Sequence, residues 1–364
     1  MALKPDCATA PKDGSEAIMR TFDYRHVPPG LFRGETGDLN VLLHEDKGKL
    51  ELLKQVRPAE IKALRDHAHI DNVEASMRIE GLFADSDRIR AIAAGATPTN
   101  ENEWQAAGYA HALELIEQDA AGLDLSTTTI VGFYEALYAH RNLGNRSRYR
   151  RKDYIYVQVD GHLQAMPVSP VTAFETPLVL GGACDSLADA FIAGTRSALI
   201  LAAVFTVDFL CIRPFEEGNG RISRLFADLL LSKAGFDVAR YTSIDRLIEN
   251  SAMEYYDALN ACVEGWDRGA NNYVPFVLYW LGKVHEAYLK VFADIESQTN
   301  AHGKSERVRA FVQSAKDPVS KRTIRAALPD VSEATVEAEL GRLVKERRVE
   351  KIGRGRATAY HWLG

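Results

Sequence analysis

The sequence predicts a mainly α-helical protein that carries one β-hairpin and ends in a smaller module of three helices and a second hairpin. Three observations support this fold class. Apolar residues recur at helical spacing over residues 58–81 and 102–143. Alternating β-forming residues flank Asp160-Gly161, which is a strong hairpin signal. Residues 304–364 carry 14 Lys and Arg against 8 Asp and Glu, although the whole chain has a net charge of −6. This asymmetry indicates a separate C-terminal module with its own partner.

Size and composition are ordinary for a soluble globular protein of two or three domains. The chain has 364 residues, of which 46% are hydrophobic and 26% charged. The longest apolar run, Ala198–Cys211, is too short for a membrane span and contains Asp208. No basic region followed by an apolar block opens the chain, and its four cysteines lack metal-ligand spacing. We therefore expect a cytoplasmic protein with no membrane contact.

The N-terminal part of the chain predicts an arm followed by a long helix. Residues 1–58 are expected to form an irregular arm, because Pro28-Pro29-Gly30 and isolated glycines interrupt any pattern. Pro58 then opens a helix that runs to about Gly81, within a region that we assign to residues 59–100. Four apolar residues of this helix share one face and are expected in the core: Ile61, Leu64, Ala68 and Val73.

Further helices, a basic loop and the hairpin follow. Residues 102–143 are expected to be helical, with Leu113, Ile116, Val131, Phe133 and Leu137 in the core. The basic run 144–152 fits either a solvated surface loop or a contact with phosphate or substrate. The hairpin comprises Tyr154–Val159 and the residues from His162 onward. Two more helices are expected over Thr242–Cys262 and Tyr273–Asp294.

The most informative stretch is residues 213–224, Arg-Pro-Phe-Glu-Glu-Gly-Asn-Gly-Arg-Ile-Ser-Arg. Gly218-Asn219-Gly220 tolerates positive φ and leaves backbone N–H groups bare where the next helix starts, which favours anions. Arg221 and Arg224, one turn apart, add donors suited to phosphate. Glu217 is placed to hold a cation such as Mg²⁺ beside the phosphates. The alternative is an ordinary helix–loop–helix corner with arginines on a solvated face.

This stretch resembles the signature of the Fic family, His-x-Phe-x-(Asp/Glu)-Gly-Asn-Gly-Arg-x-x-Arg. Every specified position matches except the first, where this chain has Arg213. The resemblance implies a helical Fic core over residues 101–300, with ATP and Mg²⁺ as ligands and transfer of AMP to a protein hydroxyl. It also implies that residues 153–166 form the flap that binds a target segment by strand addition. The phosphates would lie against Gly218, Asn219, Gly220, Arg221 and Arg224, and the metal against Glu217.

Two other regions gain a role from the resemblance. Ser76 and Glu80, four residues apart on one helix face, resemble the family's inhibitory Ser/Thr-x-x-x-Glu-Gly element. This implies that Glu80 pairs with Arg224 and keeps the γ-phosphate from docking. Tyr255 and Tyr256 lie where relatives line the nucleobase, although two adjacent tyrosines on a helix are more often packing residues.

Arg213 alters the expected chemistry, because the family's motif histidine is the general base. A guanidinium has a pKa above about 12 and five donors but no acceptor, so it cannot take a proton from the target hydroxyl. Three hypotheses remain. The chain is an adenylyltransferase impaired at this position, or a nucleotide-binding pseudoenzyme that signals through its C-terminal module. The third is a hydrolase that removes AMP through Glu80 and Glu217.

The C-terminal module, residues 304–364, resembles a winged helix-turn-helix. Helices are expected over Glu306–Ala315, Ser320–Leu328 and Glu333–Arg347, and strands flank the Gly353–Arg356 turn. The third helix would enter a major groove and Arg354 and Arg356 would contact DNA, although acidic residues at the start of that helix favour protein docking instead. The partner protein and the oligomeric state stay open, with a homodimer as one alternative.

Overall fold

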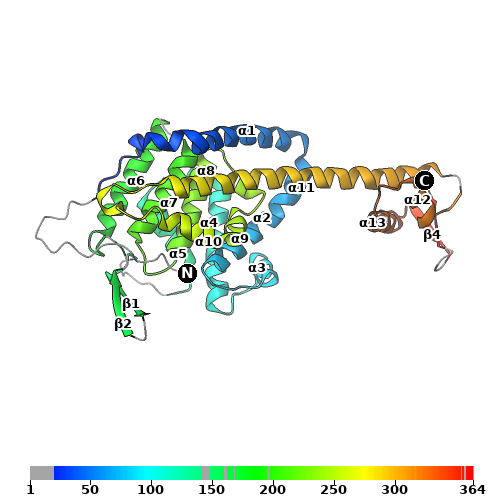
Figure 1. Ribbon diagram of the computed structural model, residues 1–364. Helices are drawn as coiled ribbons and strands as arrows, with labels where there is room; N and C mark the ends of the chain where they lie inside the picture. The colour runs from blue at the N-terminus through cyan, green and yellow to red at the C-terminus, as the bar shows by residue number, and fades with distance from the viewer. Residues whose placement is uncertain are drawn as a thin grey trace, which may run out of the picture. The chain divides into compact units, whose positions relative to one another are not determined.

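The structure is a computed structural model that describes residues 20–141, 148–159, 162–167, 169, 171–194, 197–315, 317–353, 355 and 358–363. The described chain is mainly helical and has one two-stranded and one three-stranded sheet (Figure 1). It divides into two units, Met1–Val291 and Phe292–Gly364. The predicted class, mainly helical with a β-hairpin ahead of the motif, is confirmed.

The N-terminal region is more regular than the sequence suggests. Two 3-10 turns, η1 (Tyr24–His26) and η2 (Pro29–Phe32), lead into α1 (Gly34–Val56), a helix of 23 residues. The prediction of an irregular arm is therefore wrong for α1, because it gave too much weight to isolated glycines. Gly37 has a packing reason, since a Cβ at this position would lie 2.8 Å from the carbonyl oxygen of Phe32. Glycine there permits a close approach of the backbone and does not break the helix.

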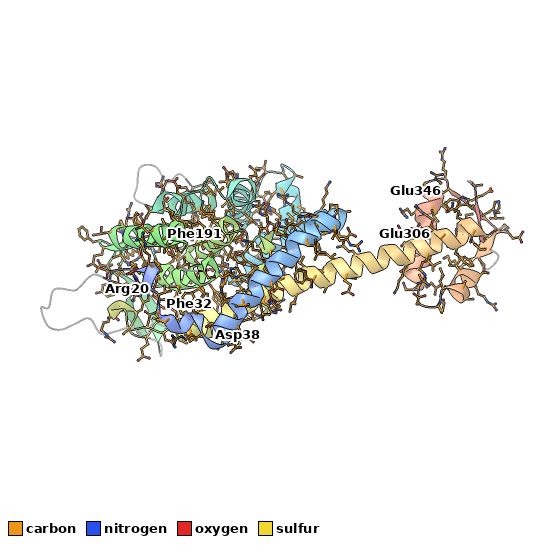
Figure 2. All side chains as sticks on the ribbon, turned by 90° about the horizontal axis from the view of Figure 1, so that it is seen from above. Arg20, Phe32, Asp38, Phe191, Glu306 and Glu346 are labelled. Atoms are coloured by element: carbon orange, nitrogen blue, oxygen red, sulfur yellow. The ribbon has the colours of Figure 1, made fainter. Side chains whose placement is uncertain are left out.

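A buried carboxylate joins the start of the described chain to the central helix α7 (Ala198–Ile212). Asp208 accepts hydrogen bonds of 2.7 Å each from the Tyr24 hydroxyl, the Trp266 indole N–H and the Tyr273 hydroxyl. The guanidinium of Arg20, labelled in Figure 2, lies 3.4 Å away. Burial raises the pKa of Asp208, and the cationic Arg20 and the three hydrogen bonds oppose this rise. The N-terminal turns are thereby fixed to the helix that leads into the motif.

The next helices begin at a proline or at a side chain that caps free N–H groups. Pro58 opens α2 as predicted, and the four side chains expected in its core are all buried. Asp85, Asn100 and Ser126 accept backbone N–H groups at the starts of the three helices that follow. In the last of these helices Ile130 is buried, whereas the predicted core residue Val131 is only half-buried. The helices are α2 (Pro58–Ile79), α3 (Ser86–Ala93), α4 (Glu101–Asp119) and α5 (Thr127–Leu137).

The centre of the first unit is α7, which packs on α6 (Thr176–Ala193) and on α8 (Asn219–Lys233). Every residue of α7 from Leu199 to Ile212 is buried, which explains why its sequence is apolar on all sides. Helix α6 is long and apolar enough to cross a membrane by length and composition, a feature that the sequence analysis missed. Seven of its 18 residues are buried against the rest of the first unit.

Two predicted helix boundaries after the motif are wrong. The single helix expected over Thr242–Cys262 is two helices, α9 (Ile244–Asn250) and α10 (Ala252–Asn260). They separate at Ser251, whose hydroxyl donates to the Leu247 carbonyl at 2.9 Å and so replaces a helical backbone bond. Conversely, the helices expected over Tyr273–Asp294 and Glu306–Ala315 form one helix, α11 (Val274–Ser314). Gly303 does not end it, because a single glycine weakens a helix only modestly.

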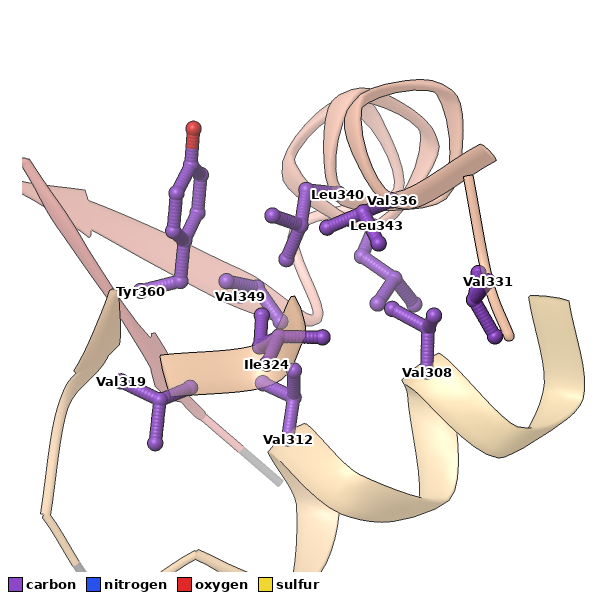
Figure 3. Close-up of a cluster of buried hydrophobic side chains, with 10 residues drawn as sticks. All are labelled: Val308, Val312, Val319, Ile324, Val331, Val336, Leu340, Leu343, Val349 and Tyr360. Carbon is purple, nitrogen blue, oxygen red and sulfur yellow. The ribbon is translucent and has the colours of Figure 1, made fainter. Parts of the chain in front are cut away.

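The C-terminal unit combines the end of α11 with α12 (Lys321–Ala327), α13 (Glu333–Lys345) and three strands. The strands β3 (Val319–Ser320), β4 (Val349–Ile352) and β5 (Ala359–Trp362) pair antiparallel in the order β3-β5-β4. Their own small core joins the helices to the sheet (Figure 3). It consists of Val308, Val312, Val319, Ile324, Val331, Val336, Leu340, Leu343, Val349 and Tyr360.

Candidate active site

The motif folds as a tight turn between α7 and α8. Helix α7 ends at Ile212, and its C-cap residue Arg213 has a left-handed backbone with φ 47° and an N–H that donates to the Phe209 carbonyl at 2.8 Å. Gly218, with φ 78°, is the N-cap of α8, where a residue without a Cβ is strongly favoured. No side chain caps the N-terminus of α8. The turn therefore presents free backbone N–H groups together with the positive end of the helix dipole.

Asn219 and Phe215 make the turn rigid. The Asn219 side-chain amide accepts from the Phe215 N–H at 3.0 Å and donates to the Phe215 carbonyl at 2.8 Å. The Phe215 ring is fully buried and stacks on Tyr134 with ring centroids 4.4 Å apart. The side chain of Asn219, which the sequence assigns to phosphate binding, is thus engaged in shaping the turn.

Arg221 is buried between α2, α4 and α5 without a carboxylate partner among the described residues. Its side chain donates to Gln105 Oε1 at 2.6 Å and to the Tyr138 hydroxyl at 3.0 Å, and Met77 Sδ lies at 3.8 Å. The residue is 2% exposed, and its Nε has no partner in the described part of the chain. A buried cation that lacks a counter-ion favours the binding of an anion.

Arg224 is also buried, but it is surrounded by oxygen atoms. Its Nε donates to the Ser76 hydroxyl at 3.1 Å, and its Nη2 donates to the Ser76 carbonyl at 3.0 Å. Glu80 Oε1 lies 3.3 Å from Nη1, and Asp245 Oδ2 lies 3.5 Å from Nε. Ser76 and Glu80 therefore both meet the second motif arginine. Burial lowers the pKa of Arg224, and the neighbouring Asp245 and Glu80 outweigh burial and raise it.

The carboxylate of Glu80 also lies directly over the start of α8. A Cβ built on Gly220 would come within 2.1 Å of Glu80 Oε1. Glycine at position 220 is thus needed for this close approach. An anion already occupies the place beside the α8 N-terminus where the sequence predicts phosphate oxygens.

Glu217, which the sequence assigns to a metal ion, is engaged by a side chain that the sequence analysis did not single out. Its Oε1 accepts a hydrogen bond from Nη1 of Arg141. No group of three or more His, Cys, Asp or Glu side chains that could hold a metal ion occurs among the described residues. As arranged here, the residues around Glu217 do not fit a divalent cation, because a guanidinium fills the position beside the carboxylate.

The side chain of Arg213 has no polar partner within the described part of the site. Its side chain is half-buried and forms no hydrogen bond or ion pair with another described residue. Its carbonyl accepts from Arg150 Nε at 3.0 Å. No histidine is found at the end of α7, so this position offers donors and no proton acceptor.

Comparison with known proteins agrees with this geometry. Residues 124–231, from just before α5 to near the end of α8, match the Fic/DOC family. The chain contains a Fic domain. Members of this family generally use ATP with Mg²⁺. The matched region includes the motif but neither Glu80 nor the C-terminal unit.

Solved structures show the same fold over a longer stretch. A Fic family protein from Desulfovibrio desulfuricans G20 is 20% identical, with a TM-score of 0.59 over 93% of this chain and 99% of that one. A Fic domain containing signaling protein from Bacteroides thetaiotaomicron VPI-5482 is 19% identical, with a TM-score of 0.56 over 71% and 97%. Fic-1 (residues 134–508) from C. elegans is 17% identical, with a TM-score of 0.53 over 71% and 72%. No curated protein matches the chain in sequence.

Arg150 connects the Fic motif to the segment that follows the hairpin by hydrogen bonds. The sequence does not distinguish it from the other basic residues of the run 144–152. Its N–H donates to the Pro214 carbonyl at 2.8 Å, and its Nη2 donates to the Val171 carbonyl. Arg150 is 2% exposed, and burial lowers its pKa. Arg148 of the same run pairs with Glu135 at 2.7 Å, and residues 142–147 lie outside the described part. Arg150 differs from the neighbouring arginine Arg148 in its burial, and no feature of the sequence predicts that burial.

The hairpin of the Fic domain pairs β1 (Tyr154–Val159) with β2 (His162–Pro167) in antiparallel register. Its predicted turn residues, Asp160 and Gly161, lie outside the described residues. Beyond β2, the Ser169 hydroxyl donates to the Cys211 carbonyl at 2.6 Å. Contacts on both sides of the hairpin thus hold its base against the end of α7.

Tyr255 and Tyr256, the predicted nucleobase residues, differ in exposure. Tyr255 is 2% exposed and packs edge-on against Phe276 and Tyr279, with centroid distances of 5.8 and 5.9 Å. Tyr256 is half-buried, and its hydroxyl donates to the Ile79 carbonyl at 3.3 Å, next to Glu80. A nucleobase contact stays a prediction, and of the two rings only Tyr256 has the exposure for it.

Proposed function

We propose that this Fic-domain protein binds ATP with its phosphates at the N-terminus of α8, and that it transfers AMP to a protein hydroxyl only slowly. The observation that carries the proposal is the carboxylate of Glu80 over Gly220 and beside Arg224. The carboxylate of Glu80 lies at the N-terminus of α8, and the backbone N–H groups and helix dipole at such a terminus favour anions. The uncompensated Arg221 beside the same turn adds to this attraction.

In the proposed reaction, a target hydroxyl attacks the α-phosphorus of ATP and pyrophosphate leaves. The proton of the hydroxyl must pass to a base, and Arg213, at the position of the family's histidine, cannot accept it. Loss of a positioned general base typically lowers a rate by roughly 10²–10⁴-fold. Phosphoryl-type transfer also depends on positioning and charge stabilisation, which the helix terminus and Arg221 would still provide.

Glu80 would act as an inhibitor that competes with phosphate. Its carboxylate and a phosphate group would use the same donors, the Arg224 guanidinium and the start of α8. Glu80 is held by its place at the C-terminal end of α2, whereas ATP must be bound from solution. The hairpin at 153–166 would then present the target segment by strand addition.

Isothermal titration of ATP into the unaltered protein and into Glu80→Gly tests the binding proposal. We expect binding to Glu80→Gly, and weaker or no binding to the unaltered protein. Glu249→Gly is the control, because Glu249 pairs with Arg246 and Arg78 and with neither motif arginine in the described part of the chain. Absence of ATP, ADP and AMP binding to Glu80→Gly would refute the proposed function.

Restoring the base tests the proposed cause of slow transfer. Arg213→His combined with Glu80→Gly should raise AMP transfer from labelled ATP by about 10²-fold or more over Glu80→Gly alone, by self-modification or in a cell lysate. A double variant that binds ATP but remains silent would favour a dedicated nucleotide-binding pseudoenzyme. Transfer at equal rates in both variants would show that Arg213 is not the limitation.

For the C-terminal unit we propose a winged-helix module that binds duplex DNA. Acidic residues at the start of α13 are neutralised from α12, since Arg325 pairs with Glu333 at 2.8 Å and Lys321 pairs with Glu337. These acids therefore oppose phosphate less than their number suggests. A salt-dependent mobility shift of the full chain should weaken in Arg354→Ala/Arg356→Ala, at two positions outside the described residues. No shift at low salt would favour protein docking.

A further inference from the structure

Arg141 lies just after α5 and faces the carboxylate that precedes the Gly218 turn. Its Nη1 donates to Glu217, and its guanidinium lies over the Tyr138 ring, 4.5 Å from the ring centroid. The side chains of Arg141 and Glu217 are 36% and 44% exposed, so their contact is at the surface beside the N-terminus of α8. The Tyr138 hydroxyl also bonds Arg221 at 3.0 Å, which links Arg141 to the motif.

A second carboxylate fixes Arg141 independently of Glu217. Glu101 Oε1 accepts from Arg141 Nε at 3.0 Å and from its Nη2 at 2.5 Å. Burial opposes the ionisation of Glu101, but hydrogen bonds with His140, Gln105 and Arg141 outweigh it and lower the pKa of Glu101 to about 2. Glu101 is therefore ionised at neutral pH. The guanidinium has three contacts. Those with Glu101 and Tyr138 would persist if the hydrogen bond to Glu217 were broken.

This arrangement leaves a fixed positive charge at the place where a metal ion would sit. A divalent cation at Glu217 would have to displace Arg141 or lie beside it, where the two positive charges would repel each other. The guanidinium has five N–H donors. Two of them bind Glu101 and one binds Glu217. Two donors are left for a phosphate oxygen that arrives at the start of α8.

We propose that the guanidinium of Arg141 takes the place of a divalent cation at Glu217, so that this site binds nucleotide phosphates without a metal ion. The proposal rests on the proposed binding of ATP and adds the source of the positive charge beside the phosphates. It also gives Glu217 a different role, because the carboxylate orients a guanidinium and does not coordinate a metal.

Titration with Mn²⁺, followed by electron paramagnetic resonance without nucleotide, tests the occupancy of the cation position. The unaltered full chain is expected to bind no Mn²⁺ at Glu217. Arg141→Ala, which leaves Glu101 and Glu217 facing one vacated position, should gain a Mn²⁺ site that Arg141→Ala/Glu217→Gln loses again. Arg141→Lys keeps a positive charge and should gain none.

Arg88→Ala is the matched control, because Arg88 is similarly exposed at 38% and forms a two-pronged pair with another carboxylate of α4, Glu103. It should gain no Mn²⁺ site. Mn²⁺ binding by the unaltered chain that disappears in Glu217→Gln would overturn the proposal, since the metal would then displace Arg141. Failure of folded Arg141→Ala, checked by circular dichroism, to gain a site would overturn it too.

Titration of ATP into Glu80→Gly, once with Mg²⁺ and once with EDTA, is the second arm. We expect the two affinities to agree within about threefold, and Glu80→Gly/Arg141→Ala to lose about tenfold in EDTA and to recover with Mg²⁺. A tenfold or greater loss in EDTA while Arg141 is present would overturn the proposal. No ATP binding under either condition would refute the proposed function instead, and the Mn²⁺ titration would decide the role of Arg141 by itself.

Discussion

Two carboxylate–arginine pairs flank the turn between α7 and α8, and they differ in how deeply the arginine is buried. In the inner pair, the side chain of Arg224 is 2% exposed and that of Glu80 is 27% exposed. In the outer pair, Arg141 and Glu217 are 36% and 44% exposed. Both arginines have a second carboxylate partner, Asp245 for Arg224 and Glu101 for Arg141.

Burial gives the two pairs different properties. A buried guanidinium cannot exchange its anions for water without a large loss of free energy, so an anion that replaces Glu80 must itself be bound. Phosphate meets this requirement, and Glu80 can therefore be both a stabilising contact and an inhibitor. The outer pair is solvated and contributes little to stability, which leaves Arg141 suited to meeting a ligand.

The largest expected difference between the pairs is in stability. Arg224→Ala should lower the free energy of unfolding by about 3–5 kcal/mol, because it leaves Asp245 and Glu80 without a counter-ion. Arg141→Ala should lower it by about 1 kcal/mol or less. Urea unfolding of both variants measures the contrast, with Arg307→Ala at an exposed pair as a control for general effects. Equal losses would show that burial does not distinguish the pairs.

A third carboxylate, Asp228, should make the surroundings of the inner pair sensitive to pH. Its Oδ1 is buried without a partner in the described part, and with Arg224 and Asp245 it lines a cavity of 20 Å³. Burial, and then the negative charges of Asp245 and Glu117, raise the pKa of Asp228 to about 7. The folded protein thus keeps a proton that the unfolded chain releases above about pH 4, so stability falls between about pH 4 and 7.

Asp228→Asn removes this titration and tests the sign of its effect. It should stabilise the protein by roughly 2–4 kcal/mol at pH 8 and change it little at pH 4, as measured by urea unfolding at both values. Glu101 is the counterpart beside the outer pair, with a pKa lowered to about 2, and its contribution should instead be lost only in acid. A variant with the same effect at pH 4 and pH 8 would contradict the raised pKa.

The two carboxylates should differ in their effect on nucleotide binding. Glu80→Gln should raise the affinity for ATP by about tenfold, since it removes an anion from the position of the phosphate. Glu217→Gln should change the affinity by less, because Arg141 stays in place through Glu101 and Tyr138. Calorimetric titration separates the two. A larger effect at Glu217 would mean that this carboxylate has the more direct role.

The smallest predicted effect concerns Gly220, and its size should depend on Glu80. In the unaltered protein, Gly220→Ala should be destabilising, because its Cβ would lie 2.1 Å from Glu80 Oε1. In Glu80→Gly the clash with the carboxylate is gone and Arg224 Nη1 is the remaining close atom, at 3.3 Å, so alanine should cost less there than in the unaltered protein. A double-mutant cycle in urea should thus give a coupling of at least about 0.5 kcal/mol. If the effects of Gly220→Ala and Glu80→Gly on stability were additive, the Glu80 carboxylate would not lie against Gly220.

Signals confined to a few neighbouring residues predicted the structure well. Pro58 opens α2, Ser332 caps α13 by accepting the Thr335 N–H at 3.1 Å, and the two predicted strands pair in register. Such features depend on local backbone geometry and on side chains two or three residues away. The long motif likewise placed the turn between α7 and α8.

Predictions failed where isolated glycines were expected to interrupt helices and where interacting residues lie far apart in the sequence. Helix α1 forms despite its glycines, and α11 continues through Gly303 although two helices were expected. The arginines of the basic run could not be ranked, because only packing in the folded chain distinguishes buried Arg150 from the less buried Arg148 and Arg151. Arg141 drew no notice, since its partners Glu101 and Glu217 lie 40 and 76 residues away in the sequence.

The sequence alone determined the motif and the absence of a histidine at position 213, and the resemblance to the family implied the pair of Glu80 with Arg224. The loss of the general base follows from residue identity, because a guanidinium lacks a proton acceptor wherever it is placed. Only the tertiary structure decided which charges meet and how far each is removed from water. It placed the Glu80 carboxylate over Gly220, left Arg221 without a counter-ion among the described residues and set Arg141 against Glu217. Electrostatic energies depend on distance and on burial, and neither is encoded locally in the chain.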